Sequence, residues 1–396
     1  MMAVGAESKG PLDGVVIADF SRVLAGPYAT MLLGDLGAEI IKVEAPVGDE
    51  TRSWKPPTYR DDATYYLSIN RNKRSVVLDL GDSKDLERAR ELIRRADVMI
   101  ENHKPGSLGK FGLDYSSVKE INPEIIYASI TGFGTDGVGG TLPGYDLMVQ
   151  AMSGLMSLTG DPDGEPMRAG VAVIDVMTGL HCVIGILAAL YERDRGTPRG
   201  REGQWVSVSL LASALSGMVN QTGANAIAGV VPFRMGNAHP SLYPYEPLAA
   251  KDQKIVIAVG NNGQFEKFVS AIGASHLAKD ERFIDNNGRN VNRDELKAIL
   301  EGYLAAKTAR EWFDILTKVG VPAGPINTVD GGVAFAEEIG IAPKVEVSYR
   351  GEIITTIRNP VTFTRTKPTY RSGPPLLGEH TDQIKAWLDA PNSPLD

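Results

Sequence analysis

One aspartate, Asp175, is a candidate for a covalent nucleophile. Asp175, in the segment GVAVIDVMTGLHCVIGILAALYE, ends an apolar strand-like run and opens a long apolar helix. Aspartate is a favoured N-cap that accepts hydrogen bonds from free N–H groups at a helix start, a role that contributes ~1 kcal/mol. The same position suits a nucleophile, because the positive helix end would keep the carboxylate ionised and its N–H groups could hold developing oxyanion charge. Carboxylates act as covalent nucleophiles in enzymes, so both interpretations stay open.

Two glycine-containing segments resemble nucleotide-binding motifs without the context that such motifs need. Residues 131–137, TGFGTDG, contain GxGxxG after an expected strand. A dinucleotide fingerprint runs straight into a helix, whereas Pro143 follows here and no strand-ending acid lies about 20 residues further on. Residues 106–110 resemble part of a phosphate loop, but Phe111 occupies the position of the magnesium-binding Ser or Thr. Nicotinamide, flavin and ATP sites are therefore disfavoured.

Metal and serine-nucleophile chemistry are also poorly supported. The chain has one cysteine, Cys182, and five scattered histidines without the paired spacing of a zinc site. The hydrolase motif GxSxG is absent, so acyl transfer would need another nucleophile. We expect no metal site and no internal disulfide.

Composition places the chain among folded proteins that do not bind nucleic acid. It has 396 residues, of which 43% are hydrophobic, enough for two or three domain cores. The 41 Lys and Arg against 49 Asp and Glu give a net charge of −8, which argues against a nucleic-acid partner. The N-terminus lacks a signal peptide pattern, and the apolar stretch 176–191 falls short of the ~20 residues of a membrane span. We expect a cytoplasmic protein without a membrane partner, and a buried helix over that stretch.

The first part of the chain alternates short β-branched runs with helical stretches. This alternation predicts βαβ units and therefore a Rossmann-like α/β domain, with a parallel sheet covered by helices on both faces. The expected strands cover residues 15–20, 38–44, 75–80, 97–102 and 125–131, and the expected helices cover 28–37 and 84–95. Several strands end in loops rich in Gly, Pro or Asn, at the sheet edge where open α/β sheets bind ligands.

A change in composition predicts a second domain. Prolines punctuate the chain after residue 230, before a clear strand, KIVIAVG, and further helices. We expect a large α/β domain over 1–217, a linker over 218–229, a smaller α/β domain over 230–325 and a C-terminal return to the large domain over 326–396.

Many blocks of the sequence, in order, resemble one enzyme family. They include PLDGVVIADFSRVLAGPYATMLLGDLGAEIIKVE, GDETR, YYLSINRNKRSVVLDL, ADVMIENHKPG, NPEIIYASITGFG, GYDLMVQAMSGLM, the Asp175 segment, GNAHPSLYPY and PLLGEH. The sequence is identified on these blocks as a member of the class III CoA-transferases, which share their fold with the α-methylacyl-CoA racemases. The resemblance covers nearly the whole chain.

The resemblance implies a reaction and an assembly. In the family, the aspartate that matches Asp175 attacks a donor acyl-CoA to form a mixed anhydride and then an aspartyl-CoA thioester, from which the acceptor carboxylate takes CoA. Acyl-CoA and a small carboxylic acid are then substrates, and no ATP, metal or permanently bound cofactor is required. Family members form interlocked homodimers, so the resemblance also implies a second copy of this chain as partner.

The resemblance further implies two sets of site residues. One set matches positions that bind CoA or line the active site in relatives: Leu24, Ala45, Leu78, Asp79, Asn102, His103, Lys110, Tyr145 and Asp146. The other set matches a mobile glycine loop that covers the reacting aspartate: Gly260, Asn261, Asn262, Gly263 and Gln264. Apart from the resemblance, His239 could donate a hydrogen bond to a substrate carboxylate or be a core histidine with its own partners, and both interpretations stay open.

Departures from the family pattern narrow the activity. Formyl-CoA:oxalate transferases carry Gln in place of Leu24 and Arg in place of Ala45, so formyl-CoA and oxalate are poorly supported, and Lys42 or Arg74 could replace the missing phosphate contact. Racemases carry His in place of Tyr145, and Tyr is a weak base at neutral pH because its usual pKa is ~10. Racemase activity is the second hypothesis, and a CoA-binding protein without turnover is the third.

The blocks RVLAGPYATMLLGDLGAEIIKVE, TYYLSINRNKRS and VGNNGQF are most similar to the members that use succinyl-CoA and dicarboxylates such as glutarate. The free end of a dicarboxylate needs a cation that can form two hydrogen bonds. Four arginines are candidates: Arg22, Arg52, Arg71 and Arg168.

Overall fold

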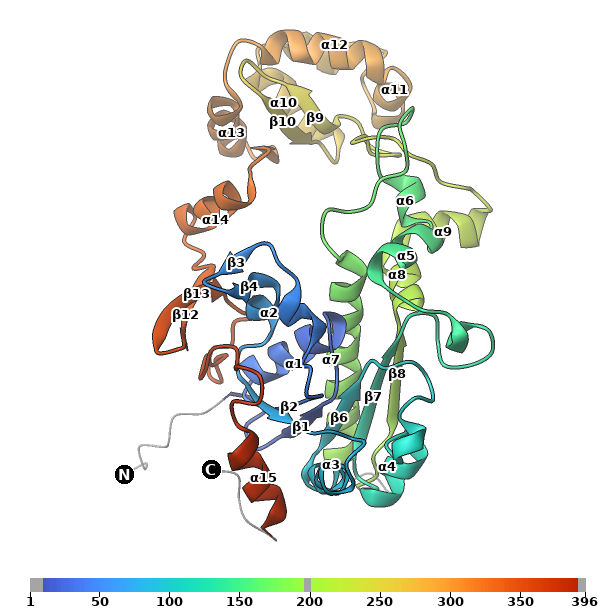
Figure 1. Cartoon of the computed structure of the whole chain (residues 1–396). Helices are drawn as coiled ribbons and strands as arrows, with labels where there is room; N and C mark the ends of the chain where they lie inside the picture. Colours follow the sequence, from blue (N-terminus) through green and yellow to red (C-terminus); the bar gives the residue numbers. More distant parts are fainter. Residues whose placement is uncertain (1–9, 196–200, 391–396) are drawn as a thin grey trace. The chain divides into compact units, whose positions relative to one another are not determined.

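The computed structural model describes residues 10–195 and 201–390, which form two compact units (Figure 1). The first unit contains the chain up to Leu155, then Arg168–Val230, then everything from Ala342 onward. The second unit contains Met156–Met167 and Val231–Ile341.

A six-stranded parallel sheet forms the centre of the first unit. Its order is β5-β2-β1-β6-β7-β8, which is the Rossmann order once the small β3–β4 hairpin is set aside, so the predicted α/β fold is confirmed. Central β1 pairs through Ile17 with Ile40 on one side and with Val98 on the other. The strands are β1 Val16–Asp19, β2 Glu39–Glu44, β5 Lys73–Val77, β6 Val98–Glu101, β7 Ile126–Thr131 and β8 Trp205–Ser209.

Helices cover both faces of this sheet because successive strand residues point to opposite sides. Ile17 packs into the core cluster shared with α1 and α7, whereas its neighbour Ala18 packs into the cluster shared with α3 and α15. The helices on the first face are α1 Ala25–Asp35, α7 Val173–Asp194 and α8 Leu210–Gly217. Those on the second face are α3 Ser83–Arg95, α4 Tyr115–Ile121 and α15 Thr381–Asp389.

Helix α7 is longer and less buried than the sequence predicts. It spans 22 residues, and in the part of the chain that is described it is the helix long and apolar enough to cross a membrane, judged by length and composition alone. One stripe, with Cys182 and Ile186, lies in the core of the unit. The opposite side leaves Ile184 and Tyr191 63% and 64% exposed. The expected buried helix is therefore wrong for that half of its surface.

The other elements of the first unit include a helix where we expected a linker. Residues 218–229, expected to be a linker, contain α9 Val219–Ala228 and belong to the first unit. The remaining elements are β3 Thr58–Tyr59, β4 Asp62–Ala63, α2 Thr64–Ile69, α5 Asp146–Met152, β12 Lys344–Tyr349, β13 Glu352–Ile357 and the short turns η1 Glu50–Ser53, η2 Gly109–Phe111 and η3 Gly139–Thr141.

The second unit has its own sheet and core. Three antiparallel strands lie in the order β11-β10-β9, and Ile255 and Ile257 of β10 pack with helix residues such as Phe268. Helix α6 Leu155–Leu158 begins at the last residue of the first unit and continues into the second. The other elements are β9 Tyr245–Ala249, β10 Lys254–Ala258, α10 Asn262–Ala271, η4 Ser275–Lys279, α11 Asn286–Val291, α12 Arg293–Leu304, α13 Ala309–Lys318, β11 Ala323–Pro325 and α14 Val329–Glu338. This unit ends at Ile341, later than the expected boundary at 325, because α14 belongs to it.

Candidate active site

A cavity of about 400 Å³ opens at the carboxyl ends of β1, β6 and β7. Strand order reverses between β1 and β6, and open α/β sheets bind ligands at such a switch point. Six of the residues predicted from the sequence line this cavity together: Arg22, Leu24, Asn102, His103, Tyr145 and Asp175. We therefore take it as the candidate active site and call it the Asp175 cavity.

The loop after β1 forms one wall of the Asp175 cavity and carries a strained residue. Val23 has a φ of 69°, in the left-handed region that β-branched residues rarely adopt. The buried Asp19 carboxylate fixes the start of the loop, since it accepts hydrogen bonds from the backbone N–H of Ser21 and from Thr30 Oγ1. Such strain persists only where the surroundings fix the backbone, and it clusters at functional sites.

A buried ion pair between Lys42 and Asp49 also fixes the backbone of this loop. Lys42 Nζ donates to the Ser21 carbonyl at 3.0 Å and to Asp49 Oδ2 at 2.9 Å, and both side chains of the pair are about 1% exposed. Asp49 also accepts from the N–H of Val23. Burial alone would raise the pKa of Asp49, but the Lys42 charge and the Thr51 hydrogen bonds hold it below its usual value. Lys42 is thus committed to Asp49, and our suggestion that it contacts a CoA phosphate is wrong.

Asn102 and His103 follow β6 and form hydrogen bonds with the backbone of the same loop. The Asn102 amide accepts from the N–H of Arg22 at 2.9 Å and donates to the Arg22 carbonyl at 2.7 Å. His103 Nε2 lies 3.1 Å from the Phe20 carbonyl. Burial and the nearby Arg22 charge lower the pKa of His103, so its ring is neutral at pH 7. Both residues therefore shape the backbone that faces the cavity.

Asp175 lies in the first turn of α7, but it does not cap the helix. The N-cap is Ala172, and the Asp146 carboxylate accepts from the N–H groups of Ile174 and Asp175 at 2.8 and 3.1 Å. The N–H groups of Val173 and Val176 bond to backbone carbonyls. The N-cap interpretation of Asp175 is wrong, and so is the expectation that these N–H groups are free to hold an oxyanion.

The protonation of Asp175 also differs from our expectation. Burial, with a further contribution from the Asp146 charge, raises the pKa of Asp175 to about 7. The helix N-terminus does not keep the carboxylate ionised, because its donors are taken by Asp146. A carboxylate with this pKa exists in both forms near neutral pH, which is typical of groups that react rather than of groups in salt bridges.

Tyr65 in α2 is affected by the charges of Asp175 and Asp146, and the sequence did not identify it as a site residue. Burial and the charges of Asp175 and Asp146 raise the pKa of Tyr65 to about 12, so its hydroxyl keeps its proton. Its ring packs edge-on against Trp54 with centroids 5.2 Å apart. The only sequence signal was the block TYYLSINRNKRS, which gives no reason to single out this tyrosine.

The other predicted residues of the first unit do not line the Asp175 cavity. Ala45, Leu78 and Asp79 follow β2 and β5 at the same carboxyl edge of the sheet, although the Leu78 side chain is buried in the core. Lys110 lies on η2, with Nζ 4.6 Å from the Phe111 ring. Asp146 is buried and accepts a hydrogen bond from the N–H of Asp175. A CoA-binding role for these residues stays a prediction.

The predicted glycine loop belongs to the second unit and forms the turn from β10 into α10. Asn261 is the N-cap and accepts from the N–H of Gln264 at 2.9 Å, while Gln264 Oε1 accepts from the N–H of Gly260 at 2.7 Å. Asn262 and Gly263 begin the helix, and a lid role for this turn stays a prediction. His239 Nδ1 accepts from the N–H groups of Ser241 and Leu242, so that nitrogen already has local partners.

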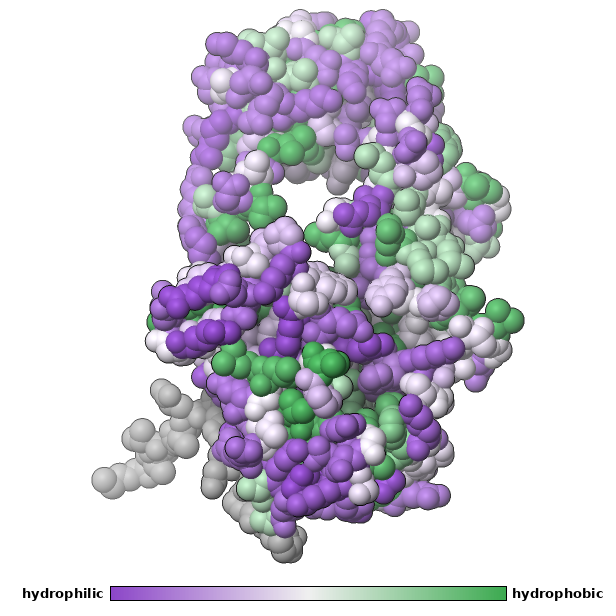
Figure 2. Space-filling view, in the orientation of Figure 1, coloured by the Kyte–Doolittle hydropathy of each residue, from purple (hydrophilic) through white to green (hydrophobic). Residues whose placement is uncertain are grey.

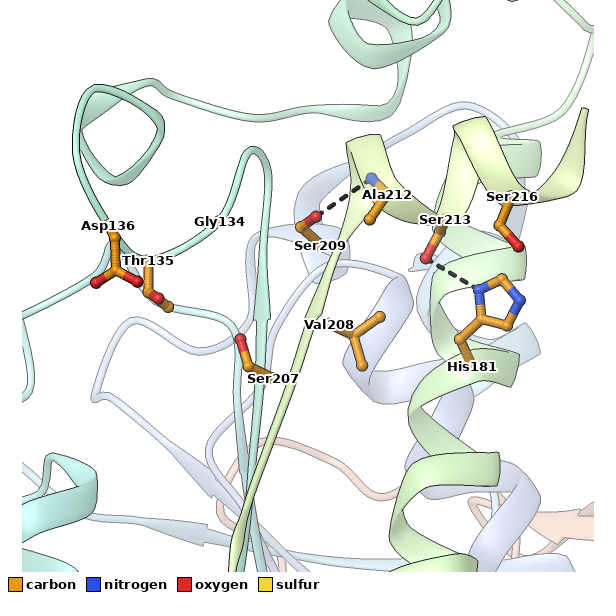
Figure 3. Close-up of a pocket in the computed structure, with 10 residues that line it drawn as sticks. All are labelled: Gly134, Thr135, Asp136, His181, Ser207, Val208, Ser209, Ala212, Ser213 and Ser216. Carbon is orange, nitrogen blue, oxygen red and sulfur yellow. Dashed lines mark hydrogen bonds between the residues drawn. The ribbon is translucent and has the colours of Figure 1, made fainter. Parts of the chain in front are cut away.

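A second cavity of about 500 Å³ lies between the loop after β7, β8 and the helices α7 and α8 (Figure 3). Half of the ten residues that line it carry a hydroxyl group, and His181 Nδ1 lies 3.0 Å from the Oγ of Ser213. None of the predicted site residues lines it. In the described chain no group of three or more His, Cys, Asp or Glu side chains could hold a metal ion.

Comparison with known proteins agrees with this fold. The sequence profile of CoA-transferase family III matches residues 12–381. The succinate–glutarate CoA-transferase of Agrobacterium fabrum is 40% identical over 96% of both chains, and the acetyl-CoA:oxalate CoA-transferase of Acetobacter aceti is 38% identical over 98% of both. The crystal structure of a CaiB/BaiF family protein from Brucella suis superimposes with a TM-score of 0.85, at 42% identity over 96% of this chain and 100% of that one.

The strand order, with a cavity at its switch point, places the chain among the doubly wound α/β proteins. The chain belongs to CoA-transferase family III.

Proposed function

We propose that the protein transfers CoA from succinyl-CoA to a small dicarboxylic acid, through covalent intermediates on Asp175. The observation that carries this proposal is the placement of Asp175, which lines the switch-point cavity with a pKa raised to about 7. A carboxylate that is ionised in a substantial fraction, yet poorly solvated, is a competent nucleophile. The proposal for the acids draws on the relatives named for succinate, glutarate and oxalate.

The reaction divides into four balanced acyl transfers. An Asp175 oxygen attacks the donor thioester carbonyl, the C–S bond breaks, and CoA leaves as the thiolate. The thiolate then attacks the aspartyl carbonyl of the anhydride and releases the donor acid as its carboxylate. The acceptor carboxylate attacks the resulting aspartyl-CoA thioester and again frees the thiolate, which attacks the acceptor carbonyl and restores Asp175. Each covalent step conserves the energy of the thioester.

The Asp175 mechanism is tested by trapping. The enzyme is incubated with succinyl-CoA and then with hydroxylamine or borohydride, and the modified peptide is identified by mass spectrometry. Asp175→Ala is expected to abolish both modification and transfer. The matched control is Asp294→Ala, an exposed aspartate in the first turn of α12, which should behave as the unmodified enzyme does. Transfer by the Asp175→Ala variant would refute the mechanism.

Two further experiments test the racemase hypothesis and the hypothesis of a CoA-binding protein without turnover. A racemase would exchange the α-proton of a 2-methylacyl-CoA into deuterated water, and we expect no exchange. A CoA-binding protein without turnover would bind CoA but form no new thioester from any of a panel of carboxylic acids.

We also propose that a second copy of the chain covers the apolar face made by α5, α7, α8 and α9. Hydrophobic side chains gather over α5, α8 and α9 in Figure 2. Exposed apolar residues of this face include Leu147, Met152, Ile184, Tyr191, Leu215, Val219 and Ile227. A large exposed apolar patch marks an interaction surface. Light scattering is expected to give the mass of a dimer, and a monomer at micromolar concentration would contradict this assembly.

A further inference from the structure

Two of the four candidate arginines for a substrate carboxylate are already occupied. Arg71 donates to both oxygens of Asp35, at 2.8 and 2.6 Å, and this pair is almost fully buried. Arg52 likewise donates to both oxygens of Glu44, at 2.9 and 2.6 Å. Because each guanidinium already forms the paired hydrogen bonds that suit a carboxylate, neither can bind a second one without breaking a buried ion pair.

Arg22 has the position and the open donors that the other candidates lack. It lines the Asp175 cavity, whereas Arg168 does not. Its side chain is 46% exposed, and its ion pair is with Glu50, whose side chain is 42% exposed and which lines the same cavity. A guanidinium has five N–H donors, so this single contact leaves donors that can face a ligand.

The backbone of Arg22 is fixed independently of its side chain. The Asn102 amide binds both the N–H and the carbonyl of Arg22, at 2.9 and 2.7 Å. The side chain thus projects from a rigid support, and its replacement removes the charge without removing the contacts that hold the loop. A cation on a rigid support binds with less loss of conformational freedom than one on a flexible loop.

We infer that Arg22 binds the distal carboxylate of the dicarboxylic acid and so determines specificity for diacids, an inference that rests on the proposed transfer reaction. In this arrangement one carboxylate of the acid reacts at Asp175 and the other forms paired hydrogen bonds with Arg22. Glu50 holds the guanidinium while the site is empty and competes with the substrate for it. Lys104 also lines the cavity, but an ammonium group offers no planar pair of donors to match a carboxylate.

An internal competition between two acceptors tests this inference. Enzyme, succinyl-CoA and equal concentrations of glutarate and pentanoate are mixed, and the ratio of glutaryl-CoA to pentanoyl-CoA is measured at early times by mass spectrometry. The two acids differ at the distal carboxylate, and both compete for the same enzyme-bound CoA, so the product ratio does not depend on the donor half-reaction. We expect Arg22→Gln to lower this ratio by about tenfold or more, and Arg22→Lys to restore part of it.

Three further variants make the test specific. Glu50→Gln should raise the ratio, because it removes the carboxylate that competes for Arg22. Lys104→Gln should leave the ratio within about twofold of the unmodified enzyme, as should Arg94→Gln, a change in an exposed ion pair of α3.

The outcomes separate the inference from the reaction on which it rests. An unmodified enzyme that forms neither new thioester refutes the proposed function. An active enzyme whose Arg22→Gln variant keeps the original ratio, or loses both products equally, refutes the role of Arg22 alone. A ratio that falls in Lys104→Gln instead assigns the distal carboxylate to Lys104 and also refutes this inference.

Discussion

The Asp146 carboxylate accepts hydrogen bonds from the N–H groups of Ile174 and Asp175, at 2.8 and 3.1 Å. One aspartate thus caps the helix that presents the other. Asp146 lies on α5, 29 positions earlier in the chain than Asp175. The arrangement frees the Asp175 side chain from a capping role, and the charge of Asp146 adds to burial in raising the pKa of Asp175.

The first prediction concerns the pH dependence of transfer. The nucleophile must be ionised, so kcat/KM for the donor is expected to rise with pH through about 7, the pKa of Asp175. Asp146→Asn keeps an oxygen that can accept the helix N–H groups but removes the charge that opposes ionisation. We expect the acidic limb of the profile to move to lower pH, so that the variant retains a larger share of its maximal rate at pH 6. An unmoved limb, in a variant that circular dichroism shows to be folded, would contradict the coupling.

The second prediction concerns the pH dependence of stability. Asp175 has a higher pKa in the folded protein than its usual value of 3.8, so between about pH 4 and pH 7 the folded state binds more protons than the unfolded state. Stability from this group therefore falls as pH rises through that window. Asp175→Asn is expected to raise the free energy of unfolding by on the order of 2 kcal/mol at pH 8 and by almost nothing at pH 4. Urea denaturation at both pH values measures the difference, and equal gains at both would be inconsistent with it.

Sequence patterns predicted the elements of the large unit better than the contacts of its site. The strands over 15–20, 38–44, 75–80, 97–102 and 125–131 were found because continuous β-branched runs are typical of buried parallel strands. The last strand of the sheet, β8, was missed because its residues alternate between half-buried and exposed at the sheet edge, where the apolar signal is weak. Helix α9 was missed because its sequence, VNQTGANAIA, is rich in residues that favour loops.

In the site, too, the sequence identified the residues better than it predicted their contacts. Asp175 was identified from its place before an apolar helix and from the family resemblance, and the structure places it in a cavity with Tyr145, Asn102 and His103. The capping role of Asp146 could not be predicted, because the two residues are joined by tertiary structure rather than by the fixed offset of a local cap. The ion pair of Lys42 with Asp49 was likewise not predicted, because burial of a charge is not visible in the sequence.

The third prediction concerns this Lys42–Asp49 pair. Its two side chains are almost fully buried, and Lys42 also binds the Ser21 carbonyl in the loop that carries Val23. Lys42→Met leaves Asp49 as an unpaired buried charge, so we expect a loss of about 3 to 5 kcal/mol in the free energy of unfolding. Lys42→Met combined with Asp49→Asn should recover part of this loss, because the unpaired charge is gone. Urea denaturation of both variants measures the effect, and a loss below about 1 kcal/mol in the single variant would show that the pair is not buried.

The fourth prediction concerns the turn from β10 into α10. Asn261 caps α10 by accepting from the N–H of Gln264, and Asn261→Ala removes that acceptor. The loss is expected to cost about 1 kcal/mol in stability of the second unit, whereas Asn261→Asp keeps the cap and should cost little. If this turn covers the reacting aspartyl group, as the family resemblance implies, the two variants separate structure from catalysis.

Under the lid hypothesis, Asn261→Asp places a negative charge near the intermediate and is expected to lower kcat about tenfold or more while leaving the denaturation midpoint unchanged. A different result would assign the turn a structural role alone: Asn261→Asp keeps the full kcat, and kcat falls only in the variant whose denaturation midpoint falls. The ratio of acyl-CoA hydrolysis to CoA transfer measures how often water reaches the anhydride. Under the same hypothesis this ratio should increase in Asn261→Ala, because a lid that closes poorly admits water.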